Sequence, residues 1–167
     1  GCAFDASIAR HMVSDVPVSA FLSGGIDSSI ISLLASQIDS NLKTFTIGLR
    51  SGDGNDDLYF AKKVSDQLHV ENNQLVVDSI SVDELIRILE YFDEPFADSA
   101  TLFSALLAKF VSSSSKVALS GDGADEIFFG YPVYDNLANG CHNSHNSSYL
   151  ISTALGIVSP RAYDYSR

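Results

Sequence analysis

The sequence predicts an α/β protein built on a doubly wound parallel sheet. Short apolar segments typical of buried strands alternate along the chain with segments of helical periodicity, which favours parallel strands joined by helices. The strand segments are apolar without strict alternation, as expected for a sheet covered on both faces. At 167 residues, 46% of them apolar, the chain is long enough to bury the core of one domain.

Four segments are predicted to be strands, because each is short and rich in apolar, β-branched or aromatic residues. They are residues 18–22, 44–49, 74–77 and 117–119. The first runs into Ser23-Gly24-Gly25 and the fourth into Ser120-Gly121. Since the carboxyl ends of parallel strands meet at one edge of a sheet, both glycine-rich loops are expected there, in a single shared site.

Helices are predicted at residues 4–14, 27–38, 58–69, 81–92 and 100–111. Ser81, followed three residues later by Glu84, has the pattern of a capping box. The apolar stripe of that helix is predicted to face the core; it consists of Leu85, Ile88, Leu89 and Phe92. Past Tyr134 the pattern weakens. We therefore divide the chain into a core of residues 1–134 and a polar linker with a short C-terminal segment of residues 135–167, including one more short helix at 152–158.

The charge of the chain limits its partners. Ten basic and 21 acidic residues give a formal net charge of −11, so we expect neither nucleic acid nor an anionic membrane as a partner. No apolar run approaches the roughly 20 residues of a membrane span, and two distant cysteines fit a reducing compartment, so a soluble cytoplasmic protein is expected. An anionic ligand would have to be held by local devices such as backbone N–H groups, a helix N-terminus and a divalent cation.

The first glycine-rich loop, Ser23 to Ser29, reads S-G-G-I-D-S-S and predicts a phosphate-binding site. Its glycines let backbone N–H groups approach phosphate oxygens, its serines supply hydroxyl donors, and the following helix presents its positive end. Asp27 would repel a phosphate, which suggests that Mg²⁺ lies between them. Neither the Walker pattern nor the dinucleotide-binding pattern is present. The alternative is a Ser/Gly turn with an Asp that caps the helix.

The second glycine-rich loop, Ser120 to Glu126, places three carboxylates and two glycines at the end of a strand. Such a cluster is destabilised by like-charge repulsion unless a cation neutralises it. Opposite the first loop it is interpreted as the other half of a site for Mg²⁺ and a triphosphate. The alternative is a solvated acidic turn that caps the next helix.

These motifs carry a resemblance to a known family. The segments "FLSGGIDSS" and "ALSGDGADEIFFGY", with "LKTFTIGL" between them, resemble the synthetase domain of glutamine-hydrolysing asparagine synthetases and their β-lactam synthetase relatives. The first loop alone is similar to the pyrophosphate loop of N-type ATP pyrophosphatases and is shared with several other synthetases; the second is more specific. The resemblance covers about residues 4–134 and implies an adenine nucleotide α-hydrolase-like fold, with ATP and Mg²⁺ as cofactors.

The resemblance implies that ATP adenylates a small, aspartate-like carboxylate with release of pyrophosphate, after which an amine forms an amide. The residues implied to hold the pyrophosphate are Ser23, Gly24, Gly25, Asp27, Ser28 and Ser29. Those implied to line the adenosine pocket are Leu22, Ile47, Ser120 and Gly121. Asp27 and Asp125 are implied to bind Mg²⁺. Asp122 matches a family carboxylate, more familiarly Glu, that acts on the incoming nitrogen. The acceptor wall is expected at residues 93–95 and 98–101.

The sequence also departs from the family pattern. Phe129 stands where the motif usually has Gly, so an altered turn before Gly130 is expected. The segment with the family's catalytic Lys and the glutaminase domain are not found, and residues 135–167 are expected to begin a missing helical part. Two hypotheses follow: an ATP-dependent amide-forming ligase domain, or a truncated, inactive ATP/Mg-binding or interaction module.

Two smaller features are left as hypotheses. A homodimer formed through the apolar helix at Leu102 to Val111 is one of them. The other concerns Cys141, His142 and His145, which lie within five residues. A flexible polar linker is favoured there over a metal site, because they fall short of a four-ligand zinc set.

Overall fold

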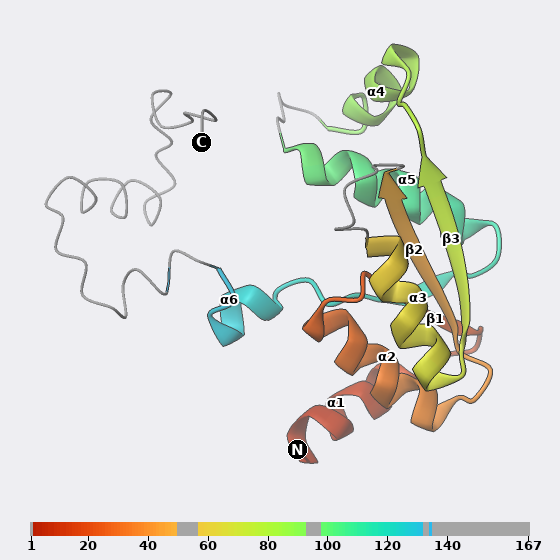
Figure 1. Cartoon of the computed structure of the whole chain (residues 1–167), viewed down its shortest axis with the longest axis vertical. Helices are drawn as coiled ribbons and strands as arrows, with labels where there is room; N and C mark the ends of the chain where they lie inside the picture. Colours follow the sequence, from red (N-terminus) through yellow and green to blue (C-terminus); the bar gives the residue numbers. More distant parts are fainter. Residues whose placement is uncertain (1, 50–56, 93–97, 132–133, 135–167) are drawn as a thin grey trace, which may run out of the picture. The chain divides into compact units, whose positions relative to one another are not determined.

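The computed structural model describes residues 2–49, 57–92, 98–131 and 134. The chain divides into two compact units, Gly1–Asp122 and Gly123–Arg167, which are described separately. In the first unit, four parallel strands form one sheet in the order β3-β2-β1-β4 (Figure 1). The strands are β1 (Val18–Phe21), β2 (Lys43–Leu49), β3 (Glu71–Val77) and β4 (Val117–Leu119). The predicted α/β fold with a parallel sheet is confirmed.

The strand order brings the two glycine-rich loops together. The chain proceeds outward from β1 to β2 and β3, and then returns to the other side of β1 with β4. Ser19 of β1 is in register with Ala118 of β4, and its hydroxyl donates to the carbonyl of Val117 at 3.0 Å. β1 and β4 are therefore neighbours, and their carboxyl ends lie side by side at the point where the direction of winding changes.

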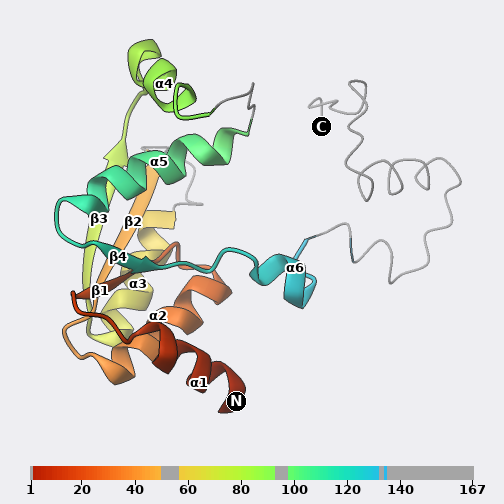
Figure 2. The same cartoon turned by 180° about the vertical axis from the view of Figure 1, so that it is seen from behind.

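Helices cover both faces of this sheet, as the two opposite views show (Figures 1 and 2). They are α1 (Cys2–His11), α2 (Ile26–Ile38), α3 (Asp57–Leu68), α4 (Val82–Leu89) and α5 (Ser99–Ser112). On one face, Ala20 of β1 packs in a core with Ile31 of α2 and Ile8 of α1. On the other face, Phe45 of β2 packs against Leu107 and Val111 of α5. The two cores hold the carboxyl ends of β1 and β2 in place from both sides.

Strand β3 begins at Glu71, three residues earlier than predicted. The reason lies in its first residues, which are polar and gave no strand signal. The side chain of Asn72 donates hydrogen bonds to the hydroxyls of Thr44 and Thr46 on β2, so this face of the sheet is partly polar. Local hydrophobicity did not predict the pairing because side-chain hydrogen bonds, rather than apolar contacts, accompany it.

Helix α4 differs from its prediction in two respects. Ser81 caps the helix by accepting from the Glu84 N–H at 3.2 Å, but the Glu84 carboxylate receives a hydrogen bond from Lys109 of α5 at 3.1 Å. In the apolar stripe only Ile88 is buried, while Leu85, Leu89 and Phe92 are each more than a third exposed. The prediction that the whole stripe is core is therefore wrong.

The second unit contains α6 (Ala124–Phe128), which ends at Phe129 in a left-handed conformation with φ 61°. Its Gly130 N–H donates to the Asp125 carbonyl at 3.0 Å. The Tyr131 hydroxyl donates to the Glu126 carboxylate at 2.6 Å. This bond lowers the pKa of Glu126 and raises the pKa of Tyr131 to about 12. With its φ of 61°, Phe129 occupies a backbone conformation that favours glycine.

Several predictions concern residues outside this description: the helix at 152–158, the Cys141-His142-His145 segment and the acceptor wall at 93–95. Among the described residues, no helix has both the length and the apolar character that a membrane crossing requires.

Candidate functional site

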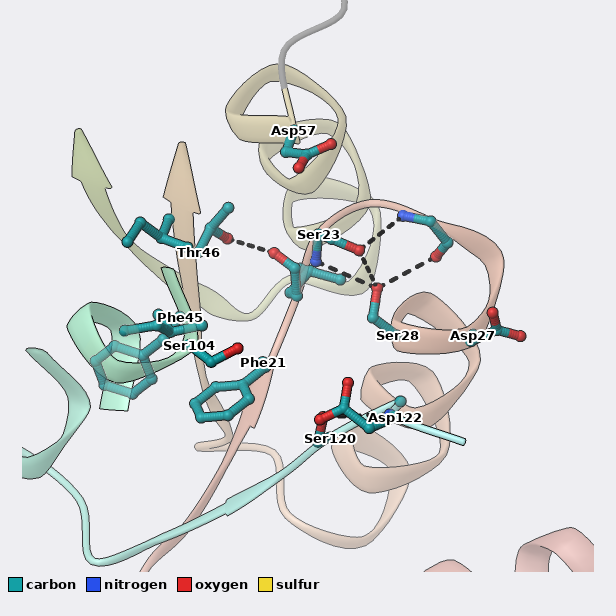
Figure 3. A pocket seen from close by; sticks show the side chains of 15 residues that line it. Phe21, Ser23, Asp27, Ser28, Phe45, Thr46, Asp57, Ser104, Ser120 and Asp122 are labelled. Atoms are coloured by element: carbon teal, nitrogen blue, oxygen red, sulfur yellow. Dashed lines mark hydrogen bonds between the residues drawn. The ribbon is translucent and has the colours of Figure 1, made fainter. Parts of the chain in front are cut away.

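A cavity of about 310 Å³ lies at the carboxyl edge of the sheet in the first unit (Figure 3). The ends of β1, β2 and β4, the first turns of α2 and α3, and one side of α5 form its walls. It is lined by Phe21, Leu22, Ser23, Gly25, Asp27, Ser28, Phe45, Thr46, Ile47, Asp57, Ser104, Leu107, Ser120, Gly121 and Asp122. The two glycine-rich loops therefore share one cavity, as their positions after neighbouring strands predict.

Gly24 shapes the first loop without lining the cavity. Its φ is +83°, in the region that favours glycine. A Cβ atom built on it would lie 2.5 Å from the Cβ of Phe60 and 2.6 Å from the amide nitrogen of Ala61. The loop backbone therefore lies directly against α3 at Gly24, and the loop turns back from there toward the cavity.

The hydroxyls of Ser23 and Ser28 connect the two ends of this loop. Their Oγ atoms lie 2.9 Å apart, and the Ser28 Oγ also accepts from the Ser23 N–H at 3.2 Å (Figure 3). The Gly25 N–H donates to the Ser23 Oγ at 3.3 Å, and the Ser28 hydroxyl is 3.3 Å from the Gly25 carbonyl. These bonds fix the loop shape before any ligand binds, which lowers the ordering cost of binding.

The N-terminus of α2 is open toward the cavity. Gly25 is the N-cap and offers no side-chain cap, and the first helical hydrogen bond runs from the Ser29 N–H to the Gly25 carbonyl at 3.1 Å. The N–H groups of the first turn therefore receive no side-chain acceptor from the cap, and they carry the positive end of the helix dipole. This arrangement suits an anion such as a phosphate.

The second loop packs directly on the first. A Cβ on Gly121 would lie 3.3 Å from the Ser28 amide nitrogen and 3.4 Å from the Asp27 Cβ, so only glycine allows so close an approach without displacement. The Asp122 N–H donates to the Ser120 Oγ at 3.3 Å, which shapes this loop in turn. Asp27, in the first turn of α2, and Asp122, in the loop after β4, thereby line the same cavity (Figure 3).

The cavity also has an apolar wall that the sequence did not identify. It consists of Phe21, Phe45 and Leu107, next to the predicted Ile47, with Ser104 at its side. Phe45 lies two positions before Ile47, so strand alternation alone would have placed it on the same face. Ser104 and Leu107 are three apart on α5, but nothing in the sequence indicated which face of α5 would border the cavity.

Three acidic residues line the cavity, Asp27, Asp57 and Asp122, and none of the described residues that line it is Lys, Arg or His. Among the described residues, no three His, Cys, Asp or Glu side chains form a group that would hold a metal by itself. Mg²⁺ commonly binds through one or two protein carboxylates together with phosphate oxygens, so a single Asp27 carboxylate fits such an ion. Asp57, at the start of α3 after a Gly/Asp-rich segment, was not predicted as a site residue.

Besides Gly24, two predicted site residues are not among those that line the cavity. The Ser29 Oγ is buried beside the loop and has no hydrogen-bond partner among the described residues. Asp125 belongs to α6 in the second unit, where its backbone carbonyl accepts from Gly130. Its predicted role as a second Mg²⁺ ligand stays a prediction.

Comparison with known proteins gives a family match. The family model of asparagine synthase matches residues 2–160. Glutamine-hydrolyzing asparagine synthetase 1 of Bacillus subtilis is 43% identical over 129 residues, which cover 77% of this chain and 20% of that protein. A glutamine-hydrolyzing asparagine synthetase of Zea mays is 31% identical over 178 residues, covering 98% of this chain and 29% of that protein. The chain thus spans about a fifth to under a third of the length of these relatives.

Solved structures share the fold at low sequence identity. An NMN synthetase from Francisella tularensis has a TM-score of 0.52 and 17% identity, covering 78% of this chain and 58% of that one. A glutamine-dependent NAD+ synthetase from Acinetobacter baumannii, solved with adenosine diphosphate, has a TM-score of 0.51 and 19% identity, covering 77% and 26%. The fold is therefore that of the adenine nucleotide α-hydrolases, as the family resemblance implied.

Proposed function

This chain belongs to the asparagine synthase family, and from that premise we propose that it binds ATP at the carboxyl edge of its sheet as part of an amide-forming ligase. The observation that carries the proposal is the packing of Gly121 against Ser28 and Asp27, which joins two loops into one cavity. One end of that cavity has an uncapped helix N-terminus and hydroxyls, which suit phosphates. The other end is apolar, which suits a nucleobase.

The proposed reaction begins with attack of a carboxylate oxygen of a small, aspartate-like acid on the α-phosphorus of ATP. The bond to the pyrophosphate leaving group breaks and an acyl-adenylate forms. An amine then attacks the acyl carbon, and AMP leaves with the bonding electron pair. Mg²⁺, held by Asp27 in this proposal, would neutralise charge on the phosphates, and binding of the same ion by Asp125 stays a prediction from the sequence.

Five of the residues that line the cavity, and the first turn of α2, have a proposed part in this scheme. Ser23, Gly25 and the first turn of α2 hold the leaving pyrophosphate through N–H and O–H groups. Ile47 and Leu22 border the adenosine. Asp122, which lines the same cavity, is positioned to accept a proton from the incoming nitrogen, since an ionised carboxylate is an acceptor only.

A second function is favoured by one observation. None of the described residues that line the cavity is basic, so within this part of the chain the charge that builds up on the phosphates in adenylation meets no cationic side chain. A module that binds ATP·Mg²⁺ without turnover needs no such cation. The two functions differ in whether pyrophosphate is released.

The experiment is ATP–pyrophosphate exchange, run beside calorimetric titration of the same chain with ATP and Mg²⁺. Exchange of labelled pyrophosphate into ATP, dependent on aspartate or another acid, supports the ligase. Binding without exchange in the presence of any acid supports the module. Absence of ATP·Mg²⁺ binding would contradict both, and unchanged affinity in both Asp27→Ala and Asp125→Ala would remove the shared metal from the proposal.

A further inference from the structure

The peptide group between Leu22 and Ser23 is held at both ends. The Leu22 carbonyl accepts from the Thr46 Oγ1 at 2.6 Å, and the Ser23 N–H donates to the Ser28 Oγ at 3.2 Å (Figure 3). In a trans peptide the C=O and N–H bonds point in opposite directions. The two bonds therefore fix the plane of this peptide from both sides, immediately before the chain reverses at Gly24.

The direction of the Thr46 hydroxyl is in turn set by Asn72. The side-chain nitrogen of Asn72 donates to the Thr44 Oγ1 at 3.0 Å and to the Thr46 Oγ1 at 2.9 Å, which uses both of its hydrogens. Each threonine oxygen accepts from Asn72 and so directs its own proton elsewhere. Thr44 donates to the Glu71 carbonyl at 2.9 Å, and Thr46 donates to Leu22.

This chain of hydrogen bonds crosses the sheet through two threonines that are almost fully buried. Thr44 and Thr46 are 0% and 2% exposed, and Asn72 is partly buried on the neighbouring edge strand β3. Hydrogen bonds in such surroundings are stronger than those in water and polarise one another. The relay therefore links β3, through β2, to Leu22, the residue between β1 and the phosphate loop.

We propose that Asn72 and Thr46 are positioning residues that set the Leu22–Ser23 peptide and thereby the affinity of the loop for nucleotide phosphates. The inference rests on the proposed function in that the ligand is ATP·Mg²⁺. Without the Thr46 hydroxyl, the Leu22 carbonyl loses the hydrogen bond from β2, and the Leu22–Ser23 peptide is free to tilt. The Ser23 N–H and the loop after it would then lose the alignment that the serine pair requires.

The chain supplies its own control in Thr44. Thr44 and Thr46 are the same residue, equally buried and bonded to the same Asn72 nitrogen, but the Thr44 proton goes to Glu71 at the far end of β3. Replacement by Val keeps the shape and removes the hydroxyl in either case. A structural role alone predicts similar effects for both variants, whereas the positioning role predicts a difference in nucleotide affinity.

The test is calorimetric titration of Thr46→Val, Thr44→Val and Thr46→Ser with ATP·Mg²⁺, beside thermal unfolding of each. We expect Thr46→Val to weaken binding about tenfold, the effect of one lost hydrogen bond, and Thr46→Ser to restore it to within about twofold. Thr44→Val should lower the melting temperature comparably and leave the dissociation constant within about twofold. Equal affinity losses in the two Val variants would overturn the proposal.

Asn72→Ala distinguishes a positioning role of Thr46 from direct contact between Thr46 and the nucleotide. Thr46 lines the cavity, whereas Asn72 is not among the lining residues. If Thr46 simply touched the nucleotide, Asn72→Ala would leave the affinity unchanged. We expect it to weaken binding several-fold and to add little in a Thr46→Val background, as for residues that act through one another. Additive losses in the double variant would overturn the relay.

A ligand-free measurement keeps this inference distinct from the proposed function. In amide proton–nitrogen NMR spectra of the chain without nucleotide, Thr46→Val should shift the Ser23 and Gly24 signals, and Thr44→Val should not. Failure of the wild-type chain to bind ATP·Mg²⁺ would reject the proposed function and the role of the relay in affinity. Binding by the wild type with unshifted Ser23 signals in Thr46→Val would reject only the relay.

Discussion

A Cβ atom on Gly24 would lie 2.5 Å from the Cβ of Phe60, closer than real Cβ atoms approach one another. The atoms it would meet include the backbone of α3, which has no flexible end to move aside. Gly24 also has φ +83°, where an L-residue is strained. Sterics and conformation thus both require glycine here, because the loop and α3 are in backbone contact.

Gly24→Ala is expected to lower the free energy of unfolding by about 2 kcal/mol or more, from overpacking together with the left-handed strain. Gly25→Ala is the matched control, since its Cβ would meet only the Ser23 Oγ at 3.4 Å and its φ is −68°. That variant should stay within about 1 kcal/mol of the wild type. Urea unfolding of both variants measures the difference, and equal destabilisation would contradict the contact with α3.

Asp27→Asn should alter the dependence of ATP binding on Mg²⁺. The Asp27 carboxylate repels phosphates when no cation is present and attracts them through the cation when one is. We therefore expect the variant to bind ATP more tightly than the wild type in EDTA and less tightly in Mg²⁺. Calorimetry under both conditions provides the measurement.

Asp15→Asn is the control for this charge change. Asp15 is an exposed residue that precedes β1, so it lies at the opposite edge of the sheet from the cavity. The Asp15→Asn substitution removes the same formal charge as Asp27→Asn. It should leave the ATP affinities in EDTA and in Mg²⁺ nearly unchanged, because exposed charges more than about 10 Å apart are largely screened. A parallel shift in Asp15→Asn and Asp27→Asn would mean that net charge, and not the site, governs binding.

Replacement of Phe129 tests the left-handed end of α6. Phe129→Gly and Phe129→Ala both remove the ring that packs edge-on against Tyr134 at 5.1 Å, and differ only in the cost of positive φ. The Gly variant should be the more stable by about 1 kcal/mol, which corresponds to about fivefold slower exchange of the Gly130 amide proton. Faster exchange in Phe129→Gly than in Phe129→Ala would be inconsistent with the backbone strain.

The bond between Tyr131 and Glu126 has a defined pH window. The pKa of Tyr131 is raised to about 12 from its ordinary 10.0. The contribution of the protonated phenol to folding stability is therefore complete below pH 10.0 and is lost as the pH rises through about 12. The pKa of Glu126 is lowered from 4.5, so its contribution is present above pH 4.5 and is lost as the pH falls through the lowered pKa. The bond is thus fully formed between these limits.

Ultraviolet titration of tyrosine ionisation, taken as the difference between the wild type and Tyr131→Phe, isolates Tyr131 from the other tyrosines. In Glu126→Gln its pKa should fall toward 10.0, because a neutral amide acceptor stabilises the protonated phenol less than a carboxylate does. An unchanged pKa in that variant would mean that the hydrogen bond is not the cause of the shift.

The parts of the fold that local signals encode were predicted from the sequence. The alternation of strands and helices gave the parallel sheet, and the glycines at 24, 25 and 121 gave the loops, because a close backbone approach leaves a visible pattern of residue types. The shared cavity followed from a general property of parallel sheets, that loops after neighbouring strands open on the same edge.

The parts that depend on tertiary contacts were not predicted. The capping box at Ser81 is only half formed, because Lys109, 25 residues after Glu84, donates a hydrogen bond to the Glu84 carboxylate. The early start of β3 depends on Asn72 meeting two threonines of another strand. Ser104 borders the cavity only because Leu107 and Val111 of its helix pack on Phe45. None of these relationships leaves a mark in the local sequence.

The place of β1 between β2 and β4 has a consequence for how the chain folds during its synthesis. Ser19 of β1 bonds to Val117 of β4 across 98 positions, so β1, its loop and α2 leave the ribosome long before their last neighbour exists. Until β4 docks, β1 is an exposed edge strand and the cavity lacks the wall that carries Asp122. A nucleotide would therefore reinforce only the finished sheet, and the half-made chain would depend on rapid docking of β4, or on chaperones, to keep that edge from pairing wrongly.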